Sequence, residues 1–286
     1  MTPSQYQSCY KNMEVPIVIN EDFLSGWQKV QIEKYLLADQ QPGLESNLDA
    51  LMGKIRDYFK SSKSITVHVQ TVDGNNTQKA FLSWQDLWYV AKKALWGKGS
   101  PEEVQVTLQL AVRFGLVKPE KLQNDYCDKV NGKVGLDCNG FVGNYVWHGA
   151  WGAPWDSDKT GADWEANKGI RTIVGGAGPQ IKTVQEISPV GTYLMALVGG
   201  DRQIIDRYGG GGAIGHLVVT QPGTLTTGYK QGKLCPVLRV YESTGRVGLT
   251  DSDYYILNVA TDGVFTVYRT SKNETKDFRI SRLACV

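Results

Sequence analysis

The sequence predicts an α+β fold, in which a helix packs on an antiparallel sheet. Helical patterns dominate the first part of the chain, whereas from Tyr193 onward apolar and polar residues alternate in successive short segments. Between these regions, residues 135–149 carry the start and stop signals of a separate helix. Helices followed by a strand meander are typical of α+β domains.

Residues 1 to about 60 are predicted to be mainly helical. Helices are expected over residues 21–37 and 44–59, and Gln41-Pro42-Gly43 breaks the chain between them. A β-hairpin follows: residues 64–72 alternate, and a second strand ends near Leu82. His68 lies on the polar face of the first strand, so we expect its side chain in solvent.

Two further helices have clear N-terminal signals. Ser83 caps a helix expected to run to about Trp96, and Ser100-Pro-Glu-Glu103 forms a capping box with proline at the first helical position. The glycine-containing break at residues 97–99 separates these helices. We place a domain boundary there, with an N-terminal module over 1–98 and a catalytic domain over 99–286.

Six short strands are predicted in the last third of the chain. Each is an alternating or continuous apolar run bounded by turn residues. They cover residues 193–198, 213–220, 237–243, 254–260, 264–269 and 277–283.

Composition excludes several classes of protein. The apolar fraction of 41% and the charged fraction of 21% are ordinary for a globular chain. The net charge is only +2, and basic residues are dispersed, so no nucleic-acid partner is expected. No run approaches the ~20 apolar residues of a membrane span, and residues 1–13 lack a secretory signal pattern. We therefore expect synthesis in the bacterial cytoplasm.

The cysteines indicate neither a disulfide framework nor a zinc site. Their number is odd, their spacing is wide, and no C-x-x-C pair occurs. The five cysteines are Cys9, Cys127, Cys138, Cys235 and Cys285.

Cys138 is the candidate nucleophile. Asp137 is a suitable N-cap, apolar residues recur on one helical face after it, and Gly149 ends the pattern. Unpaired N–H groups and the helix dipole at this position favour a thiolate over a thiol. The alternative is a small apolar residue that begins a buried face.

His216 is the best candidate for the base that activates this cysteine. His148 follows Cys138 by ten residues, about 15 Å along one helix, which is too far for pairing. His216 lies in a predicted strand, where the neighbouring Gly215 leaves room for a helix or a ligand.

Glu242 is the candidate for the group that orients the histidine. It continues the apolar face formed by Leu238 and Val240, where an unpaired carboxylate would be costly. The alternative is that the strand ends at Tyr241 and Glu242 begins a turn. Paired and perturbed groups gather at functional sites, which favours the catalytic interpretation.

An aromatic and glycine-rich stretch follows the Cys138 helix. It contains Trp151 and Trp155, and no clear period relates them. It is either an irregular loop fixed by its aromatic side chains or a surface on which exposed rings contact a sugar or peptide ligand.

At this point the sequence resembles the NlpC/P60 group of papain-like cysteine peptidases. Asp137-Cys-Asn-Gly-Phe-Val142 is similar to the family signature Asp-Cys-Ser-Gly-Phe-Val, with Asn139 in place of serine. Pro189-Val-Gly-Thr-Tyr-Leu194 resembles the strand entry Pro-Gly-Asp-Leu, with an insertion and without the aspartate. Gly215-His-Leu-Val-Val219 is similar to the family's Gly-His-Val-Gly-Ile strand.

Two other features extend this resemblance. Glu242-Ser-Thr244 is closer to the related CHAP amidases, in which a glutamate follows the histidine strand. Tyr126 precedes Cys138 by twelve residues, similar to the family's upstream tyrosine, although the usual Trp-Gly-Gly after it is absent. The resemblance covers about residues 110–286 and none of residues 1–98.

The resemblance implies a papain-like core and hydrolysis of an amide bond in bacterial peptidoglycan, without a metal or an organic cofactor. Cys138 would attack the carbonyl, His216 would transfer the proton, and Glu242 would orient the imidazole. The oxyanion would be held by the backbone N–H of Cys138 and by Tyr126. Asp137, Trp151 and Trp155 would complete the oxyanion and substrate surroundings.

The expected partner is therefore the peptidoglycan stem peptide. Without a signal segment, the chain is expected to be a type VI-like antibacterial effector that acts in a target periplasm beside a neutralising immunity protein, or a phage lytic enzyme. One alternative is a cysteine protease or deamidase acting on target proteins. Another is a non-catalytic cell-wall-binding module.

Overall fold

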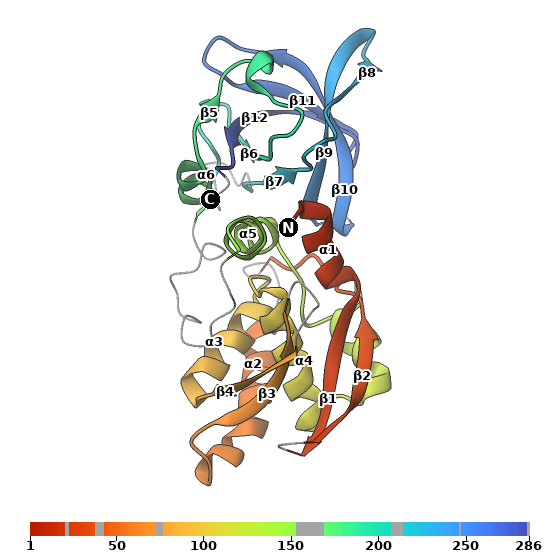
Figure 1. Ribbon diagram of the computed structural model, residues 1–286, viewed down its shortest axis with the longest axis vertical. Coiled ribbons are helices and arrows are strands. Elements are labelled where there is room, and N and C mark those ends of the chain that lie inside the picture. Colours follow the sequence, from red (N-terminus) through yellow and green to blue (C-terminus); the bar gives the residue numbers. More distant parts are fainter. Residues whose placement is uncertain are drawn as a thin grey trace.

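A computed structural model describes residues 1–20, 23–37, 43–71, 77–152, 169–206, 214–245 and 247–284. Figure 1 shows two hairpins and several helices at one end of the molecule and a group of strands at the other. Helix α5 (Cys138–Asn144), which begins at the candidate nucleophile, lies between these two ends.

The C-terminal strands form a closed barrel. Each of six strands pairs antiparallel with two others, in the cyclic order β10, β11, β12, β6, β7, β9 and back to β10. Two short strands lie outside the ring, where β5 (Gln180–Ile181) pairs with β12 and β8 (Thr226–Lys230) pairs with β9. The ring consists of β6 (Tyr193–Leu197), β7 (Leu217–Thr220), β9 (Lys233–Thr244), β10 (Gly248–Val259), β11 (Phe265–Arg269) and β12 (Glu274–Arg282).

The predicted papain-like core, a helix packed on an antiparallel sheet, is therefore wrong. The six strands lie where alternation predicted them, but the pairing of β9 with β10 closes them into a ring, and α5 packs outside it against β7 and β9. Sequence periodicity identifies extended segments and does not specify their partners. β9 and β10 have twelve residues each, so β9 can pair with β7 and β8 along one edge and with β10 along the other.

Alternate residues of β6 and β7 face two different cores. Met195 and Val218 belong to the apolar interior of the barrel, whereas Leu194 and Val219 pack with residues of the helical part of the chain. This double burial explains why both strands consist almost entirely of apolar residues.

The N-terminal part contains two hairpins where only one was predicted. Residues 21–37, predicted to be helical, contain strand β2 (Phe23–Val30), which pairs with β1 (Met13–Asn20). Large apolar side chains on the exposed face of β2, such as Phe23 and Trp27, hide the alternation from a pattern-based prediction. His68, predicted to be solvated, is only 6% exposed and packs beneath α4 (Pro101–Arg113), whose Gln109 hydrogen-bonds to its backbone.

Two capped helices and one hairpin are confirmed in the N-terminal part, whereas residues 41 and 42 of the predicted break lie outside the described residues. Ser83 and Ser100 each form a capping box at the start of α3 and α4, with hydrogen bonds between the cap and the third helical residue. The predicted hairpin over 64–82 is also present. The elements are α1 (Pro3–Lys11), α2 (Leu44–Arg56), η2 (Tyr58–Lys60), β3 (Ile65–Gln70), β4 (Thr77–Leu82) and α3 (Trp84–Leu95).

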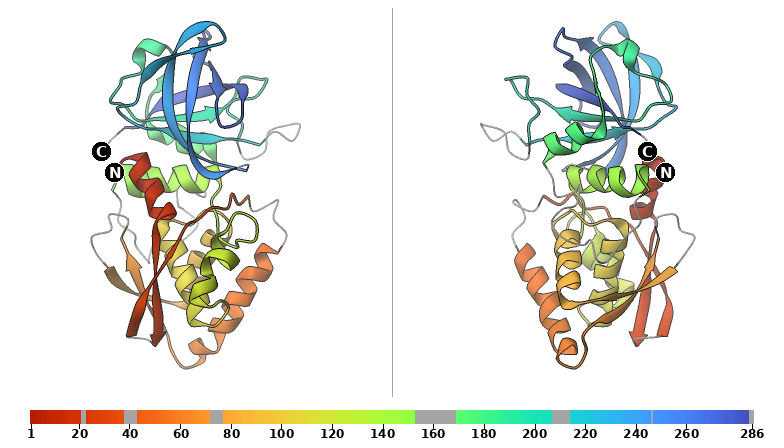
Figure 2. Two further views of the ribbon diagram at one scale, coloured as in Figure 1. Left: turned by 90° about the vertical axis from the view of Figure 1, so that its right-hand side faces the viewer. Right: turned by 60° about the vertical axis from the view of Figure 1, so that its left-hand side comes forward.

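One hydrophobic core extends from the N-terminal region through α5 to the outer face of the barrel. Tyr6 and Tyr10 of α1 place their ring centroids 6.0 and 6.4 Å from that of Phe141 in α5. Figure 2 shows α1 beside α5, where α1 contacts η5 and β9. The division at residue 98 stays a prediction. The other short helices are η3 (Pro119–Lys121), η4 (Gln123–Cys127), η5 (Tyr145–Ala150), α6 (Ile170–Ala177) and η8 (Val184–Glu186).

Candidate active site

The start of α5 is fixed from two sides by Asp137, as its N-cap role predicts. Its Oδ1 accepts a hydrogen bond from the Gly140 N–H at 2.6 Å, and its Oδ2 lies 2.6 Å from Lys98 Nζ in a buried ion pair. Its own N–H donates to the Gly97 carbonyl at 3.1 Å. The helix that carries Cys138 is thus held by the segment between α3 and α4.

Gly140 makes this close docking possible. A Cβ atom at this position would lie 1.9 Å from the Gly97 carbonyl oxygen, far inside van der Waals contact. The glycine of the Asp-Cys-Asn-Gly motif therefore has a packing role, because only a residue without a side chain lets the two backbones meet.

His216 reaches the site from the residue directly before β7. Its carbonyl accepts a hydrogen bond from the Leu197 N–H at 2.9 Å, which ties it to β6. Gly215 was expected to leave room for a helix or a ligand. Instead, a Cβ there would lie 2.1 Å from the Asp206 carbonyl oxygen, so this glycine accommodates backbone of the preceding loop.

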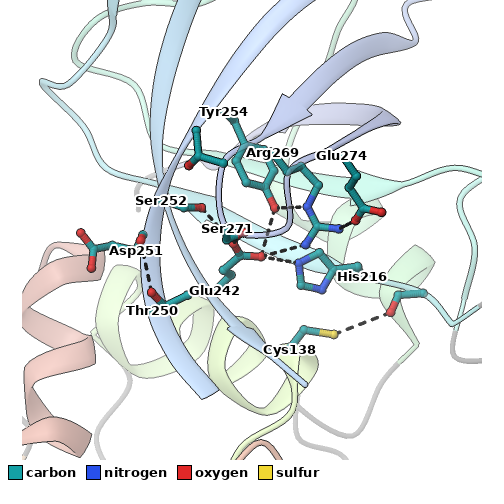
Figure 3. A network of polar contacts seen from close by, with 12 residues as sticks. Cys138, His216, Glu242, Thr250, Asp251, Ser252, Tyr254, Arg269, Ser271 and Glu274 are labelled. Atoms are coloured by element: carbon teal, nitrogen blue, oxygen red, sulfur yellow. Dashed lines mark hydrogen bonds and ion pairs between the residues drawn. The ribbon is translucent and has the colours of Figure 1, made fainter. Parts of the chain in front are cut away.

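The thiol of Cys138 contacts the backbone on both sides of His216. Its Sγ lies 3.9 Å from the Gly215 carbonyl oxygen and accepts a hydrogen bond from the Leu217 N–H. Figure 3 shows the imidazole between the Cys138 side chain and the Glu242 carboxylate. The structure therefore brings together the three residues predicted to form the catalytic group.

Glu242 is fully buried at the centre of a polar network. Its Oε2 lies 2.6 Å from His216 Nε2 and also accepts from the Tyr254 hydroxyl at 3.0 Å and from Arg269 Nη2 at 3.1 Å. Its Oε1 accepts from the hydroxyls of Ser252 and Ser271 at 2.9 and 2.7 Å. Five donors thus hold one carboxylate, and Glu242 belongs to β9, not to a turn.

The hydrogen bond to Glu242 defines the tautomer of His216. An ionised carboxylate only accepts hydrogen bonds, so the proton of the neutral imidazole is on Nε2. Nδ1 then carries the lone pair and is the nitrogen that can take a proton from a thiol. This is the arrangement required of a general base that is oriented by an acid.

Burial and the charge of Arg269 both shift the pKa values of Glu242 and His216. Burial acts to raise the pKa of Glu242, but the hydrogen bond from His216, the charge of Arg269 and the hydrogen bond from Ser271 oppose it, and that pKa lies below its usual range. Burial lowers the pKa of His216; Glu242 opposes this, while the charges of Arg269 and Lys272 add to it. The resting imidazole is therefore neutral near pH 7.

The thiolate expected at the start of the helix is not the resting form. Burial, together with the charge of Asp137, raises the pKa of the Cys138 thiol to about 11. Lys98 and the N–H groups of Leu217 and Asn139 act in the opposite direction but are weaker. Desolvation of a side chain that is only 5% exposed thus exceeds the effect of the helix terminus.

Tyr126 lies in η4 and is buried in the core of the helical part. Burial and the charge of Asp125 raise its pKa to about 12, so its hydroxyl keeps its proton. Lys133 Nζ lies 4.5 Å from the centroid of its ring, and its backbone carbonyl accepts a hydrogen bond from the Val134 N–H. These contacts, made within the described residues, do not join it to Cys138, His216 or Glu242.

Of the two tryptophans predicted as substrate contacts, only Trp151 lies within the described residues. Trp151 donates its indole N–H to the Ala284 carbonyl at 3.0 Å, and its ring lies 6.1 Å from that of Trp147. Trp155 lies outside the described residues. Trp151 therefore has a structural role in joining the end of the Cys138 helix to the C-terminal segment.

Two absences can be stated of the described residues. Among them, no three His, Cys, Asp or Glu side chains converge in a way that could hold a metal ion. No helix within the described ranges has the length and apolar character required to cross a membrane. Cys127 is a buried free thiol.

Arg269 and Tyr254 are site residues that the sequence analysis missed. Arg269 continues the buried face of β11 formed by Phe265 and Val267, which is the same signal that identified Glu242 on β9. Two opposite charges that each end an apolar face could have been paired by this criterion. Tyr254 carries no such signal, because a tyrosine in a strand is usually a core residue.

Comparison of the chain with protein-family models, with curated proteins and with solved structures gave no match. The assignment of a function therefore depends on the arrangement of the side chains described above.

Proposed function

We propose that the protein is a cysteine hydrolase of amide bonds, in which Cys138 is the nucleophile, His216 the general base and Glu242 the orienting acid. The observation that carries this proposal is the 2.6 Å contact of His216 Nε2 with Glu242, combined with a thiol packed against the backbone on both sides of the same histidine. A cysteine that only fills the core would need neither a neighbouring histidine nor a carboxylate that holds this histidine.

The neutral resting state determines the order of proton transfer. His216 Nδ1 takes the thiol proton as the sulfur attacks the carbonyl carbon, and Glu242 stabilises the imidazolium that forms. We assign the oxyanion to the backbone N–H of Cys138, and Tyr126 remains a candidate through the resemblance alone. The imidazolium returns the proton to the leaving amine, and water then hydrolyses the thioester.

The substrate class is proposed from the sequence. The Asp-Cys-Asn-Gly-Phe-Val motif supports an amide of the peptidoglycan peptide, either within the stem or at its junction with the sugar. A cell-wall substrate in turn favours an antibacterial effector with an immunity protein, or a phage lytic enzyme. The closed barrel around the orienting acid does not distinguish this substrate from a protein.

The test is digestion of purified peptidoglycan, followed by mass spectrometry of the released fragments. We expect new amine termini with the wild type and none with Cys138→Ala. Cys235→Ala is the matched control, because Cys235 is equally buried but lies near the start of β9 and outside the polar network. Release from a protein mixture only would support the protease or deamidase alternative. Equal binding to cell walls and no cleavage by either protein would support a binding module.

A further inference from the structure

The Glu242 carboxylate is shared by the neutral imidazole of His216 and the guanidinium of Arg269, which hydrogen-bond to the same oxygen. His216 Nε2 and Arg269 Nη2 lie 2.6 and 3.1 Å from the same Oε2 atom. The side chain of Arg269 is 4% exposed, so solvent screens its charge poorly. The histidine therefore meets a carboxylate whose charge is already balanced in part.

The positive charge of Arg269 is also partly balanced by Glu274, on the side away from Glu242. Its Nε donates to the Tyr254 hydroxyl at 2.8 Å, and its Nη1 lies 2.9 Å from Glu274 Oε1. The side chain of Glu274 is 34% exposed. An alternating chain of charges thus extends from the partly exposed Glu274 through Arg269 and Glu242 to the imidazole, as Figure 3 shows.

We propose that Arg269 is a positioning residue that keeps His216 neutral at rest, so that the imidazolium forms only when the thiol attacks. This inference rests on the proposed function, in which His216 must be free to take a proton. Without Arg269, the full charge of Glu242 would act on the imidazole and favour the protonated form, which cannot accept a proton from Cys138.

Among the described residues, the charged and titratable groups that bear on the pH behaviour of His216 come from several elements. The nearest is Glu242, and Arg269 and Lys272 contribute positive charge. Cys138 faces the ring from α5, with Asp137 and Lys98 behind it. The groups are Cys138, Asp137 and Lys98 on the helix side, Glu242 on β9, Tyr254 on β10, Arg269 on β11, Lys272 in the following turn and Glu274 on β12.

The experiment is an NMR titration of the His216 ring in full-length variants, which requires no activity. The sequence has only three histidines, so His216→Gln assigns the signal. Arg269→Gln should raise the pKa of His216 by about one unit, while Glu274→Gln, which leaves the charge of Arg269 unopposed, should shift it in the opposite direction. Arg269→Lys should restore most of the wild-type value.

Arg239→Gln is the matched control. Arg239 of β9 pairs with Asp251 and Asp253 of β10 in the same barrel but does not contact Glu242, so the His216 titration should not move. An unchanged pKa in folded Arg269→Gln, or shifts of the same sign in the Arg269 and Glu274 variants, would overturn the inference. Opposite shifts in these two variants support it.

Activity gives a separate readout. In Arg269→Gln, the acidic limb of the kcat/KM profile should move to higher pH together with the His216 titration. If no variant and no wild type cleaves any amide while the titrations shift as expected, the proposed hydrolase function fails and the control of His216 by Arg269 stands. If the wild type cleaves but the acidic limb of Arg269→Gln does not move, the inference fails and the hydrolase function stands.

Discussion

Replacement of Glu242 by glutamine tests the polar network most directly, because it removes a charge while almost preserving shape. The amide oxygen can occupy the Oε2 position and accept from His216, Tyr254 and Arg269. The amide nitrogen then meets two serine hydroxyls, which can rotate to accept. The number of hydrogen bonds is thus nearly unchanged, and the perturbation is mainly electrostatic.

The expected loss of stability follows from the ion pair with Arg269. Removing one partner of a buried pair typically costs 3–5 kcal/mol, roughly, because the other charge is left uncompensated. Arg269 keeps Glu274 on its other side, which places the expected loss at the lower end, about 3 kcal/mol. Activity should fall about 10²–10⁴-fold, since the imidazole loses the charge that stabilises its protonated form.

The assay is urea denaturation followed by tryptophan fluorescence and circular dichroism, at pH 7 and at about pH 3.5. The folded state holds the pKa of Glu242 below its unfolded value, so its contribution is fully present above the unfolded pKa of about 4.3 and is lost as pH falls toward the folded pKa. The difference between wild type and Glu242→Gln should therefore shrink at the lower pH.

Asp57→Asn is the control for this experiment. Asp57 forms an ion pair with Lys60, but both side chains are more than 70% exposed, so its loss should have almost no effect on stability. If Glu242→Gln and wild type unfold at the same urea concentration at pH 7, the network does not stabilise the fold as argued. Full hydrolytic activity of a folded Glu242→Gln variant would remove Glu242 from the mechanism.

Three other predictions concern helix α5, which carries Cys138, and the contacts that hold its start. Gly140→Ala should lower the free energy of unfolding by about 3 kcal/mol or more, because its Cβ would meet the Gly97 carbonyl, which belongs to the backbone. Lys98→Met should cost about 3–5 kcal/mol by leaving the buried Asp137 carboxylate unpaired. Between pH 8.5 and 11, wild type should lose up to about 3 kcal/mol more stability than Cys138→Ser, because the folded state raises the thiol pKa to about 11.

Each of these predictions has a measurement that can contradict it. Thermal and urea denaturation of Gly140→Ala should show a lower midpoint than for Gly53→Ala, since a Cβ at Gly53 meets nothing within 4 Å. Lys60→Met is the exposed counterpart of Lys98→Met, and equal effects of the two would refute the role of burial. Parallel alkaline stability curves for wild type and Cys138→Ser would show that the thiol is not desolvated.

The sequence predicted the strands and the elements that carry Cys138 and Glu242 far better than the fold. Asp137 as N-cap, Cys138 at the first helical position and Glu242 on an apolar face are local patterns, and local periodicity is enough to recognise them. Closure of the barrel depends on which strands pair, and no residue pattern in β9 or β10 specifies that choice. The resting state of Cys138 also depends on burial by distant segments, which the helix-terminus argument could not include.

The N-terminal region shows where periodicity misleads. Residues 21–37 were predicted to be helical, but β2 exposes Phe23 and Trp27 on its solvent face, where polar residues are usual. His68 was placed in solvent because its strand alternates. The side chain of His68 is nevertheless buried, and Gln109 of α4 pairs with both the N–H and the carbonyl of its backbone. Burial by another segment of the chain is a tertiary property.

The contact of Tyr6 and Tyr10 with Phe141 has a consequence for how the chain can be divided. These rings belong to the same hydrophobic core as the outer residues of β6 and β7. A fragment starting after residue 98 would present Phe141 to water and lose the Lys98 partner of Asp137. Heating the intact chain should accordingly produce a single calorimetric peak, and shortened versions made for crystallography or assay should keep the first helix.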